Sequence, residues 1–461
     1  MSESVGQSAV SQPLVEGHQR LSFSEELLWF SDRARAGSIV FLECPFNLSM
    51  ALRLENRLDV PALRSSLQEI VRRHAVLRSR YPERDGRPLR IIEASTRIPF
   101  PEIDLRSLPA PGQAAAVDRL LASQVHRAFD VQSGPLLRAG LLVLADEVHI
   151  FAVTVHHIVF DGWSRHVLSR ELGALYYAYS TGQPCQLPEP SASYPDYVLW
   201  QHARLQGDTA HRLMEAWTAR LGSPTELRLP SDQPPGHRTS GRAGSCHFTV
   251  PAQQTDALRA LSRTNGVTVA NTMLALFTLL LHKIAGALDI VVGVPISDRR
   301  RREFEDLIGL FNNVLVVRAD LSGNPDFLAL LKRVRKGLQD AYGQQDLPYW
   351  YFVKSQAAAT GKPLNAPFRV VFNFMSHAPQ HSQVEFEGLK VEALAVGNQP
   401  PSLADLSLHG RDQGDILACR LLYKPELFSS RLAERFADQF MTLLALVLDL
   451  PAIAIAEYKV S

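Results

Sequence analysis

The stretch V-H-H-I-V-F-D-G-W-S, residues 155–164, places two adjacent histidines at the end of an apolar run. Asp161 and Gly162 come four and five positions after the second histidine. Neighbouring side chains on a strand point to opposite faces, so His156 and His157 cannot share one environment. The pattern predicts a strand that delivers one histidine to a reaction site, followed by a sharp turn that the glycine permits.

The chemistry that such a histidine performs is proton transfer. Imidazole titrates near neutral pH and can take a proton from an attacking amine or alcohol. No serine or cysteine lies in a G-x-S-x-G elbow, which favours direct attack of one substrate on the acyl group of another over a covalent acyl-enzyme. Asp161 then has two open roles: it accepts a hydrogen bond from a histidine, or it pairs with an arginine and holds the loop. We expect a helix from Ser164, with amide hydrogens that face the same corner.

Length and composition bound the class of protein. The chain has 461 residues, more than one hydrophobic core usually supports, so we expect two domains. Hydrophobic residues make up 46% and charged residues 21%, as in soluble globular proteins. A formal net charge of +1 gives no reason to expect nucleic acid or a membrane as a partner. The four cysteines form no C-x-x-C pair and the amino terminus lacks a signal-peptide pattern, so we expect a cytoplasmic protein without a zinc site.

Helix and strand patterns alternate irregularly along the chain. Ser24 is placed to cap a first helix, apolar residues recur at helical spacing over 61–80, and 136–155 has the pattern of a β-hairpin. Residues 1–19 are polar, and the four prolines of 181–196 are typical of a linker. Later helical patterns lie at 252–265, 268–285, 325–342 and 430–448, and strand-like runs lie at 289–294, 313–318 and 368–374. This order predicts two α+β domains rather than one doubly wound sheet.

Several motifs occur together in a known order. Residues 155–164 resemble the H-H-x-x-x-D-G signature of the condensation domains of nonribosomal peptide synthetases. L-S-F-S-E-E-L-L-W-F (21–30) and R-R-H-A-V-L-R-S-R-Y (72–81) resemble two earlier family motifs, with departures at Glu25 and Ala75. The later matches are Y-P-D-Y-V-L-W (194–200), D-I-V-V-G-V-P-I-S-D-R (289–299), I-G-L-F-N-N-V-L-V-V-R (308–318) and Q-Q-D-L-P-Y (344–349). The resemblance covers residues 20–450.

The resemblance implies a fold and a division of the chain. Two chloramphenicol-acetyltransferase-like α+β domains form a V-shaped pair with a tunnel along their interface. The expected parts are a flexible leader at 1–19, an N-terminal domain at 20–185 with the histidine motif, and a C-terminal domain at 186–461 with floor-loop and bridging segments. Residues 289–299 resemble the segment that crosses the floor of the tunnel.

The resemblance also implies roles for the motif residues. His157 is the tunnel histidine that acts as base or positions the nucleophile, and His156 is its packed and hydrogen-bonded neighbour. Asp161 is expected to pair with Arg299, and the backbone of Gly162 to lie beside the thioester.

Three residues outside these roles also carry expectations. Asn313 is expected to bond a backbone group that lines the tunnel. Trp163 has two open interpretations, as a tunnel-lining side chain or as a core residue at the helix start. His74, on the apolar stripe of its helix, is expected to be a hydrogen-bonded core histidine.

The partners follow from the same resemblance. No cofactor or metal is expected, because the acyl donor arrives on the phosphopantetheine arm of an acyl or peptidyl carrier protein. The acceptor is a small amine or alcohol, so the product is an amide or an ester, with chain release included, in nonribosomal peptide or polyketide biosynthesis. The chain has no carrier-type phosphopantetheine site of its own, which predicts a free-standing, monomeric enzyme that meets its carrier protein in trans.

Two other functions compete with this interpretation. A coenzyme-A-dependent acyltransferase of the plant type shares H-x-x-x-D-G, but its D-F-G-W-G string is absent here. A non-catalytic, condensation-like recruitment module is the second alternative, although such modules have degraded histidine motifs and this motif is intact.

Overall fold

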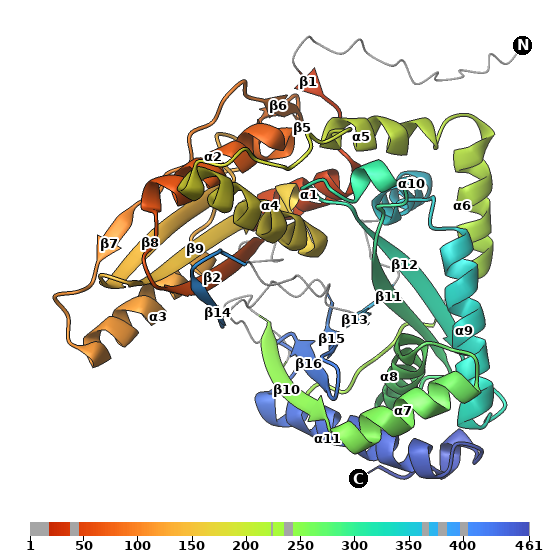
Figure 1. Cartoon of the computed structure of the whole chain (residues 1–461). Helices are drawn as coiled ribbons and strands as arrows, with labels where there is room; N and C mark the ends of the chain where they lie inside the picture. Colours follow the sequence, from red (N-terminus) through yellow and green to blue (C-terminus); the bar gives the residue numbers. More distant parts are fainter. Residues whose placement is uncertain are drawn as a thin grey trace, which may run out of the picture.

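Two β-sheets with packed helices build the two lobes of the molecule, which open from a shared region near α1, α5 and α10 (Figure 1). The computed structural model describes residues 18–36, 46–222, 225–234, 243–361, 368–376, 385–396 and 404–460. Most of the expected leader, residues 1–17, therefore lies outside the described residues. Its last two residues form β1 (His18–Gln19), which pairs with β6 (Arg90–Ile92).

The first sheet has five strands in the order β14-β2-β9-β8-β7. Their bounds are β2 (Asn47–Glu55), β7 (Glu102–Asp104), β8 (Leu137–Ala145), β9 (Val148–His156) and β14 (Lys390–Leu394). Apolar residues of α2 (Val60–Arg73) and α4 (Gly162–Thr181) pack in the core on one face, and α3 (Ala110–His126) packs on the other. The predicted hairpin is confirmed, since β8 and β9 pair in antiparallel register and present the histidine pair at the end of β9.

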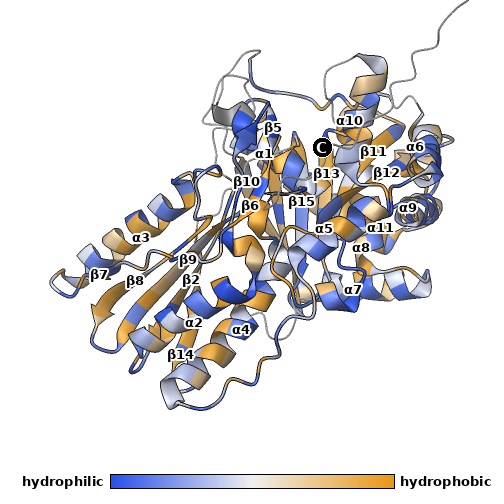
Figure 2. Cartoon of the chain, turned by 90° about the horizontal axis from the view of Figure 1, so that it is seen from above, coloured by the Kyte–Doolittle hydropathy of each residue, from blue (hydrophilic) through white to orange (hydrophobic). Residues whose placement is uncertain are grey.

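The second sheet has six strands in the order β10-β16-β15-β13-β11-β12. Their bounds are β10 (Gly244–Val250), β11 (Asp289–Ser297), β12 (Asn312–Asp320), β13 (Val370–Met375), β15 (Leu406–Asp412) and β16 (Leu417–Tyr423). One face carries the second core, with α7 (Ala252–Thr264), α8 (Val269–Ala285), α9 (Phe327–Gly343) and α11 (Ser430–Asp449). Apolar residues gather along these strands and the inner helix faces, with polar residues outside (Figure 2). The chain is therefore an α+β pair of lobes, as expected.

The remaining elements join the lobes or extend the first one. They are α1 (Phe23–Ala36), α5 (Tyr194–Ala203), α6 (Asp208–Leu221), α10 (Tyr349–Thr360), the short strands β3 (Ser79–Arg80), β4 (Glu83–Arg84) and β5 (Arg87–Pro88), and the 3₁₀ turns η1 (Ala75–Arg78), η2 (His157–Val159), η3 (Arg302–Phe304) and η4 (Ile455–Glu457). Helix α1 bridges the lobes: Leu28 and Trp29 lie in the first core, whereas Phe23 packs with Trp217 and Trp350 beside β11 and β12.

The first core draws on residues far along the chain. Phe304, Leu307 and Phe311, which follow β11, are buried in it, and so is Phe386, just before β14. Strand β14 itself pairs antiparallel with β2. Segments of the second half of the chain thus complete the first lobe. The segment after β11 also hydrogen-bonds to Asp161 and Ser164, beside the histidine pair.

Two local expectations from the sequence are wrong. Helix α2 ends at Arg73 rather than near residue 80, because His74 leaves the helical conformation and its ring contacts Glu171. The first helix is capped by Ser22 rather than Ser24. The Ser22 hydroxyl accepts from the Glu25 amide at 3.1 Å, and the Glu25 carboxylate accepts from the Ser22 amide at 2.6 Å, which is a capping box.

Among the described residues, no single helix is long and apolar enough to cross a membrane. Helices α7 and α8 pass that test only as a pair bent by 103°, and α8 is an inner helix of the second core.

Candidate active site

The histidine pair lies where β9 leaves the first sheet. His156 is the last residue of the strand, and the 3₁₀ turn His157–Val159 follows at once. The His157 amide donates to the Phe46 carbonyl at 2.7 Å, next to β2. The expectation that both histidines lie on the strand is wrong, because His157 already belongs to the turn, and the turn rather than strand alternation separates the two rings.

The ring of His157 is held by one backbone contact. Its Nδ1 lies 2.5 Å from the carbonyl oxygen of Phe160, three residues along the chain. A carbonyl oxygen only accepts, so Nδ1 carries the proton in the neutral ring and Nε2 keeps its lone pair. Within the described part of the chain, Nε2 has no hydrogen-bond partner, and the side chain keeps partial exposure. A neutral imidazole in this tautomer is a proton acceptor.

The surroundings of His157 favour that neutral form. Burial lowers its pKa from the ordinary value of 6.5, and this effect outweighs the Phe160 carbonyl and the Asp161 charge, which act in the opposite direction. At neutral pH the ring is therefore unprotonated and ready to accept.

His156 has a different setting. It is almost fully buried, its Nδ1 accepts from the Ile158 amide at 3.2 Å, and its ring meets the edges of Phe46 and Phe129. Its Nε2 lies 3.8 Å from Asp32 Oδ1 on α1. The expectation of a packed, hydrogen-bonded neighbour is confirmed, because the ring holds the turn that carries His157.

Asp161 is the amino-terminal cap of α4. Its Oδ1 accepts from the Ser164 amide and from the Ser164 hydroxyl, both at 2.8 Å. The helix consequently begins at Gly162, two residues earlier than expected. Among the described residues, the hydrogen-bond partners of this carboxylate are Ser164, Arg299 and the Phe311 amide, and neither histidine ring is one of them, so the triad-like role does not arise.

The buried partner of Asp161 is Arg299, which follows β11 in the second half of the chain. Arg299 Nη1 donates to Oδ2 at 2.5 Å and Nη2 donates to Oδ1 at 3.0 Å, a two-pronged ion pair. Both side chains are almost fully buried, at 1% and 4% exposure, and the guanidinium lies 3.9 Å from the centre of the Phe311 ring. The expected pairing is confirmed.

Electrostatics keep Asp161 ionised despite its burial. Burial alone would raise the pKa of this carboxyl, but the Arg299 charge and the hydrogen bonds from Arg299 and Ser164 bring the pKa below its usual value. The charged pair is thus a fixed part of the fold near neutral pH.

Ser164, expected only as the start of a helix, has a buried hydroxyl whose hydrogen bonds sequence reasoning missed. Its hydroxyl lies 3.0 Å from the Gly309 amide and 3.1 Å from Arg299 Nη2, and the Phe311 amide donates to Asp161 Oδ2 at 3.1 Å. The start of α4 and the segment after β11 therefore share one hydrogen-bond network. The D-x-x-S spacing of a helix cap is the local signal that could have indicated Ser164.

Gly162 is not needed for backbone conformation. Its φ is outside the left-handed region, and a Cβ built on it would meet no atom within 4 Å. The conformational freedom that the glycine permits is therefore not used, because Gly162 is the first residue of α4. A side chain here would instead project into open space beside the histidine turn.

Asn313 and Trp163 differ in burial and in the groups that they bond. Asn313 is buried; its side-chain amide donates to the Gln345 and Leu347 carbonyls and its Oδ1 accepts from the Tyr349 amide, which anchors Q-Q-D-L-P-Y to β12. Trp163 is 41% exposed and its indole donates to the Glu305 carbonyl at 2.8 Å. A core role for Trp163 is therefore wrong.

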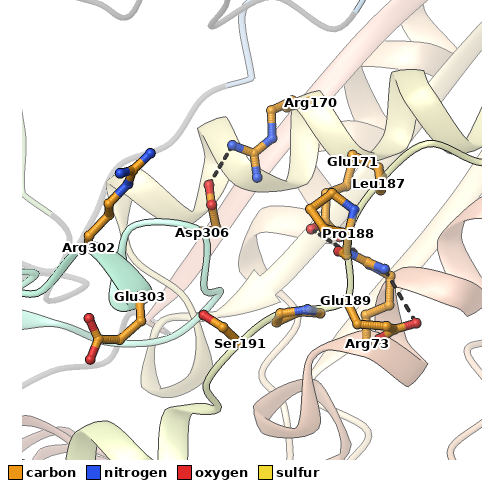
Figure 3. Close-up of a pocket in the computed structure, with 11 residues that line it drawn as sticks. Arg73, Arg170, Glu171, Leu187, Pro188, Glu189, Ser191, Arg302, Glu303 and Asp306 are labelled. Carbon is orange, nitrogen blue, oxygen red and sulfur yellow. Dashed lines mark hydrogen bonds and ion pairs between the residues drawn. The ribbon is translucent and has the colours of Figure 1, made fainter.

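A separate groove is lined by residues of α2, of α4, of the stretch 187–191 and of the segment after β11 (Figure 3). This cavity of about 530 Å³ is lined by eleven residues that do not include the histidine pair. Two of its arginines are paired, Arg73 with Glu171 and Arg170 with Asp306. Glu171 also binds His74 at 3.0 Å, which confirms His74 as a hydrogen-bonded core residue. The groove is a charged surface feature rather than the reaction centre.

No group of three or more histidine, cysteine and acidic side chains within the described ranges is arranged to hold a metal ion. The chemical capacity of the site lies in the His157 ring, the backbone around it and the open space beside Gly162.

Comparisons with known proteins agree with this arrangement. Residues 18–461 match the family described as "Condensation domain". One component of the linear gramicidin synthase of Brevibacillus parabrevis is 36% identical over 449 residues, 96% of this chain and 6% of that protein. Phosphinothricin tripeptide synthetase PhsC of Streptomyces viridochromogenes is 36% identical over 435 residues, 92% of this chain and 39% of that protein. The chain thus spans less than half the length of each of these relatives.

Solved structures show the same fold. The X-domain from teicoplanin biosynthesis superposes with a TM-score of 0.86 at 23% identity, covering 98% of this chain and 99% of that one. SgcC5 of Streptomyces globisporus superposes with a TM-score of 0.77 at 25% identity, covering 94% of this chain and 99% of that one. With the histidine motif, its capping aspartate and the match over residues 18–461, the chain belongs to the condensation-domain family.

Proposed function

We propose that this domain transfers an acyl group from the phosphopantetheine thioester of a carrier protein to a small amine or alcohol, with His157 as the base. The observation that carries the proposal is the His157 ring, whose Nδ1 is held by the Phe160 carbonyl while Nε2 has no partner among the described residues. Membership of the condensation-domain family supports the same chemistry.

The proposed step balances without a cofactor. The acceptor nitrogen or oxygen attacks the thioester carbon while its proton passes to His157 Nε2. The carbon–sulfur bond then breaks, and the proton passes to the departing thiolate. One amide or ester bond forms and one thiol is released.

Asp161 and Arg299 act in this proposal as positioning residues. They hold the start of α4 and the segment after β11 against the histidine turn, and within the described part of the chain neither is hydrogen-bonded to the His157 ring. The open space at Gly162 gives the slender pantetheine arm room beside the histidine turn, along the proposed tunnel between the lobes.

The donor is tested by initial rates with one acyl group on three carriers: a carrier protein, coenzyme A and a short pantetheine mimic. Protein–protein contact should supply much of the affinity, so the acylated carrier protein is expected to be the preferred donor. Equal efficiency with coenzyme A would assign the domain to coenzyme-A-dependent acyl transfer instead. Absence of transfer from every donor would favour a recruitment role.

The acceptor is tested with a matched panel of amines, alcohols and a vicinal diol. The diol is included because the SgcC5 structure contains (R)-(−)-1-(2-naphthyl)-1,2-ethanediol, as a ligand of that protein. Mass analysis of the products distinguishes amide from ester formation.

A further inference from the structure

Arg411 and His409 point away from the second core and toward the first lobe. On β15, Leu406 and Leu408 lie in the second core. Side chains alternate along a strand, so His409 and Arg411 extend from the opposite face of the sheet. That face is not covered by α7, α8, α9 or α11, which pack on the core side.

Arg420 shares this face of the sheet. On β16, Cys419 and Leu421 are core residues, so Arg420 between them points the other way. It lies directly opposite His409 in the antiparallel register of β15 and β16. Burial together with the Arg420 charge lowers the pKa of His409 to about 4, so this histidine is neutral and adds no charge.

Arg165 brings the first lobe to the same place. It lies in the first turn of α4, three residues after Gly162, and its Nη2 donates to the Ser49 carbonyl at 3.4 Å. Burial lowers the pKa of Arg165, and the Arg411 charge lowers it further. Burial and the Arg411 charge also lower the pKa of Arg420. Arg411 and Arg420 share one face of neighbouring strands, because Arg420 lies opposite His409, two residues from Arg411. The Arg411 charge also acts on Arg165 of the first lobe.

None of the three guanidinium groups has a carboxylate within 4.0 Å among the described residues. This distinguishes them from Arg299, which is paired with Asp161, and from the paired arginines of the charged groove in Figure 3.

Such a cluster is unfavourable unless an anion joins it. Arg165 and Arg420 are half-buried, whereas Arg411 is exposed. Like charges that lie close together repel, and a half-buried cation without an anionic partner loses hydration that no counter-charge replaces. Guanidinium groups present paired donors that match the oxygens of a carboxylate or a phosphate. An anionic ligand would satisfy all three arginines at once.

We propose that Arg165, Arg411 and Arg420 form a binding site between the lobes for an anionic group of a substrate. The inference rests on the proposed function, because the site begins one helical turn from Gly162 and so concerns the same reaction space. Two substrates could supply the anion: an acceptor with a free carboxylate, or the pantetheine arm through its phosphate.

The test measures equilibrium binding of matched probe pairs to the intact protein by calorimetry. The first pair set is free amino acids against their carboxamides, and the second is 4′-phosphopantetheine against pantetheine. At least one anionic probe should bind about tenfold tighter than its neutral counterpart. Arg411→Gln and Arg420→Gln should reduce that preference toward equality.

The pair that shows the preference identifies the source of the anion. Preference for amino acids over carboxamides assigns the acceptor, and preference for the phosphorylated arm assigns the donor. Equal affinities within every pair, or no binding of any probe, would overturn the proposal. An undiminished preference in both variants would also overturn it.

The control is Arg431→Gln, which removes the same charge from an exposed position at the start of α11, on the core-side layer. It should leave the preference unchanged. Arg411→Gln and Arg420→Gln should unfold at temperatures no lower than the wild type, since each relieves repulsion. Because the readout is binding, loss of carrier-dependent transfer with a retained anion preference would count against the proposed function alone.

Discussion

At the scale of single residues, the site depends on which nitrogen of His157 carries the proton. The Phe160 carbonyl holds Nδ1–H, so the basic lone pair is on Nε2. Nothing in the sequence around the motif indicates this tautomer, because the carbonyl is positioned by the turn between β9 and α4. The residue types of the motif were predictable from the sequence. The orientation of the His157 ring was not, because it depends on where the turn places the Phe160 carbonyl.

The pH dependence of transfer should report on this ring. The base acts when neutral, and burial lowers the pKa of His157 from 6.5. With an alcohol acceptor, which does not titrate in this range, kcat/KM should stay level as the pH falls through 6.5 and decline only below it. An acidic limb with its midpoint above 6.5 would contradict the assignment.

Gly162 offers a variant that separates activity from stability. A side chain there meets no atom within 4 Å, so Gly162→Leu should fold with an unchanged melting temperature. The added side chain would occupy the space proposed for the pantetheine arm, so kcat/KM with an acylated carrier protein should fall by at least about tenfold, a loss of about 1.4 kcal/mol in transition-state binding. The control is Gly343→Leu, because Gly343 also has open space around it and is the last residue of α9. Gly182→Leu is unsuitable, because the φ of Gly182 is +71°. Full activity of Gly162→Leu would remove the arm from this position.

At the scale of elements, the junction between α4 and the segment after β11 is one buried network. Asp161 caps the helix and pairs with Arg299, while the Gly309 amide donates to the Ser164 hydroxyl. The family resemblance predicted the ion pair, and it is present. The helix cap and Ser164 were missed, although both follow from ordinary capping preferences.

A double-mutant cycle should measure the charge component of this junction. Arg299→Met leaves a buried carboxylate unpaired and should cost about 3–5 kcal/mol of unfolding free energy. Asp161→Asn keeps a side-chain oxygen for the helix cap, so it isolates the loss of charge. The double variant should be less destabilised than the sum of the two, as judged by urea unfolding. Additive effects would mean that the contact contributes no coupling.

The end of helix α2 could not be predicted from the local apolar pattern. The apolar spacing of 61–80 is genuine, yet α2 stops at Arg73 because the His74 ring binds Glu171 and accepts from the Ile308 amide at 3.3 Å. Both partners are distant in sequence. The hairpin of β8 and β9, by contrast, was predictable because its pairing is local.

At the scale of the whole molecule, the lobes are not independent pieces of chain. The first core contains Tyr194 and Tyr197 of α5, Phe311 from the segment after β11, and Phe386 before β14. The proposed anion site likewise draws on residues of α4, β15 and β16. Sequence reasoning indicated two α+β lobes, but it could not reveal such long-range contacts, which no local period encodes.

The shared core predicts the behaviour of a fragment. Residues 20–185 alone would lack these aromatic side chains, and losing one buried phenylalanine already costs about 3–5 kcal/mol. The fragment should therefore show no cooperative thermal unfolding, whereas the full chain should. A fragment with a sharp transition and native-like near-ultraviolet circular dichroism would show that the first lobe stands alone.

The most direct measurement of the central claim is the single-turnover rate of acyl transfer from a loaded carrier protein to an alcohol, for the wild type and for His157→Ala. An alcohol is the sensitive acceptor, because its proton must be removed during attack, whereas an already deprotonated amine needs less help. The account predicts a variant that unfolds at the wild-type temperature and transfers at least about 10²-fold more slowly. A well-folded His157→Ala that transfers at nearly the wild-type rate would contradict it.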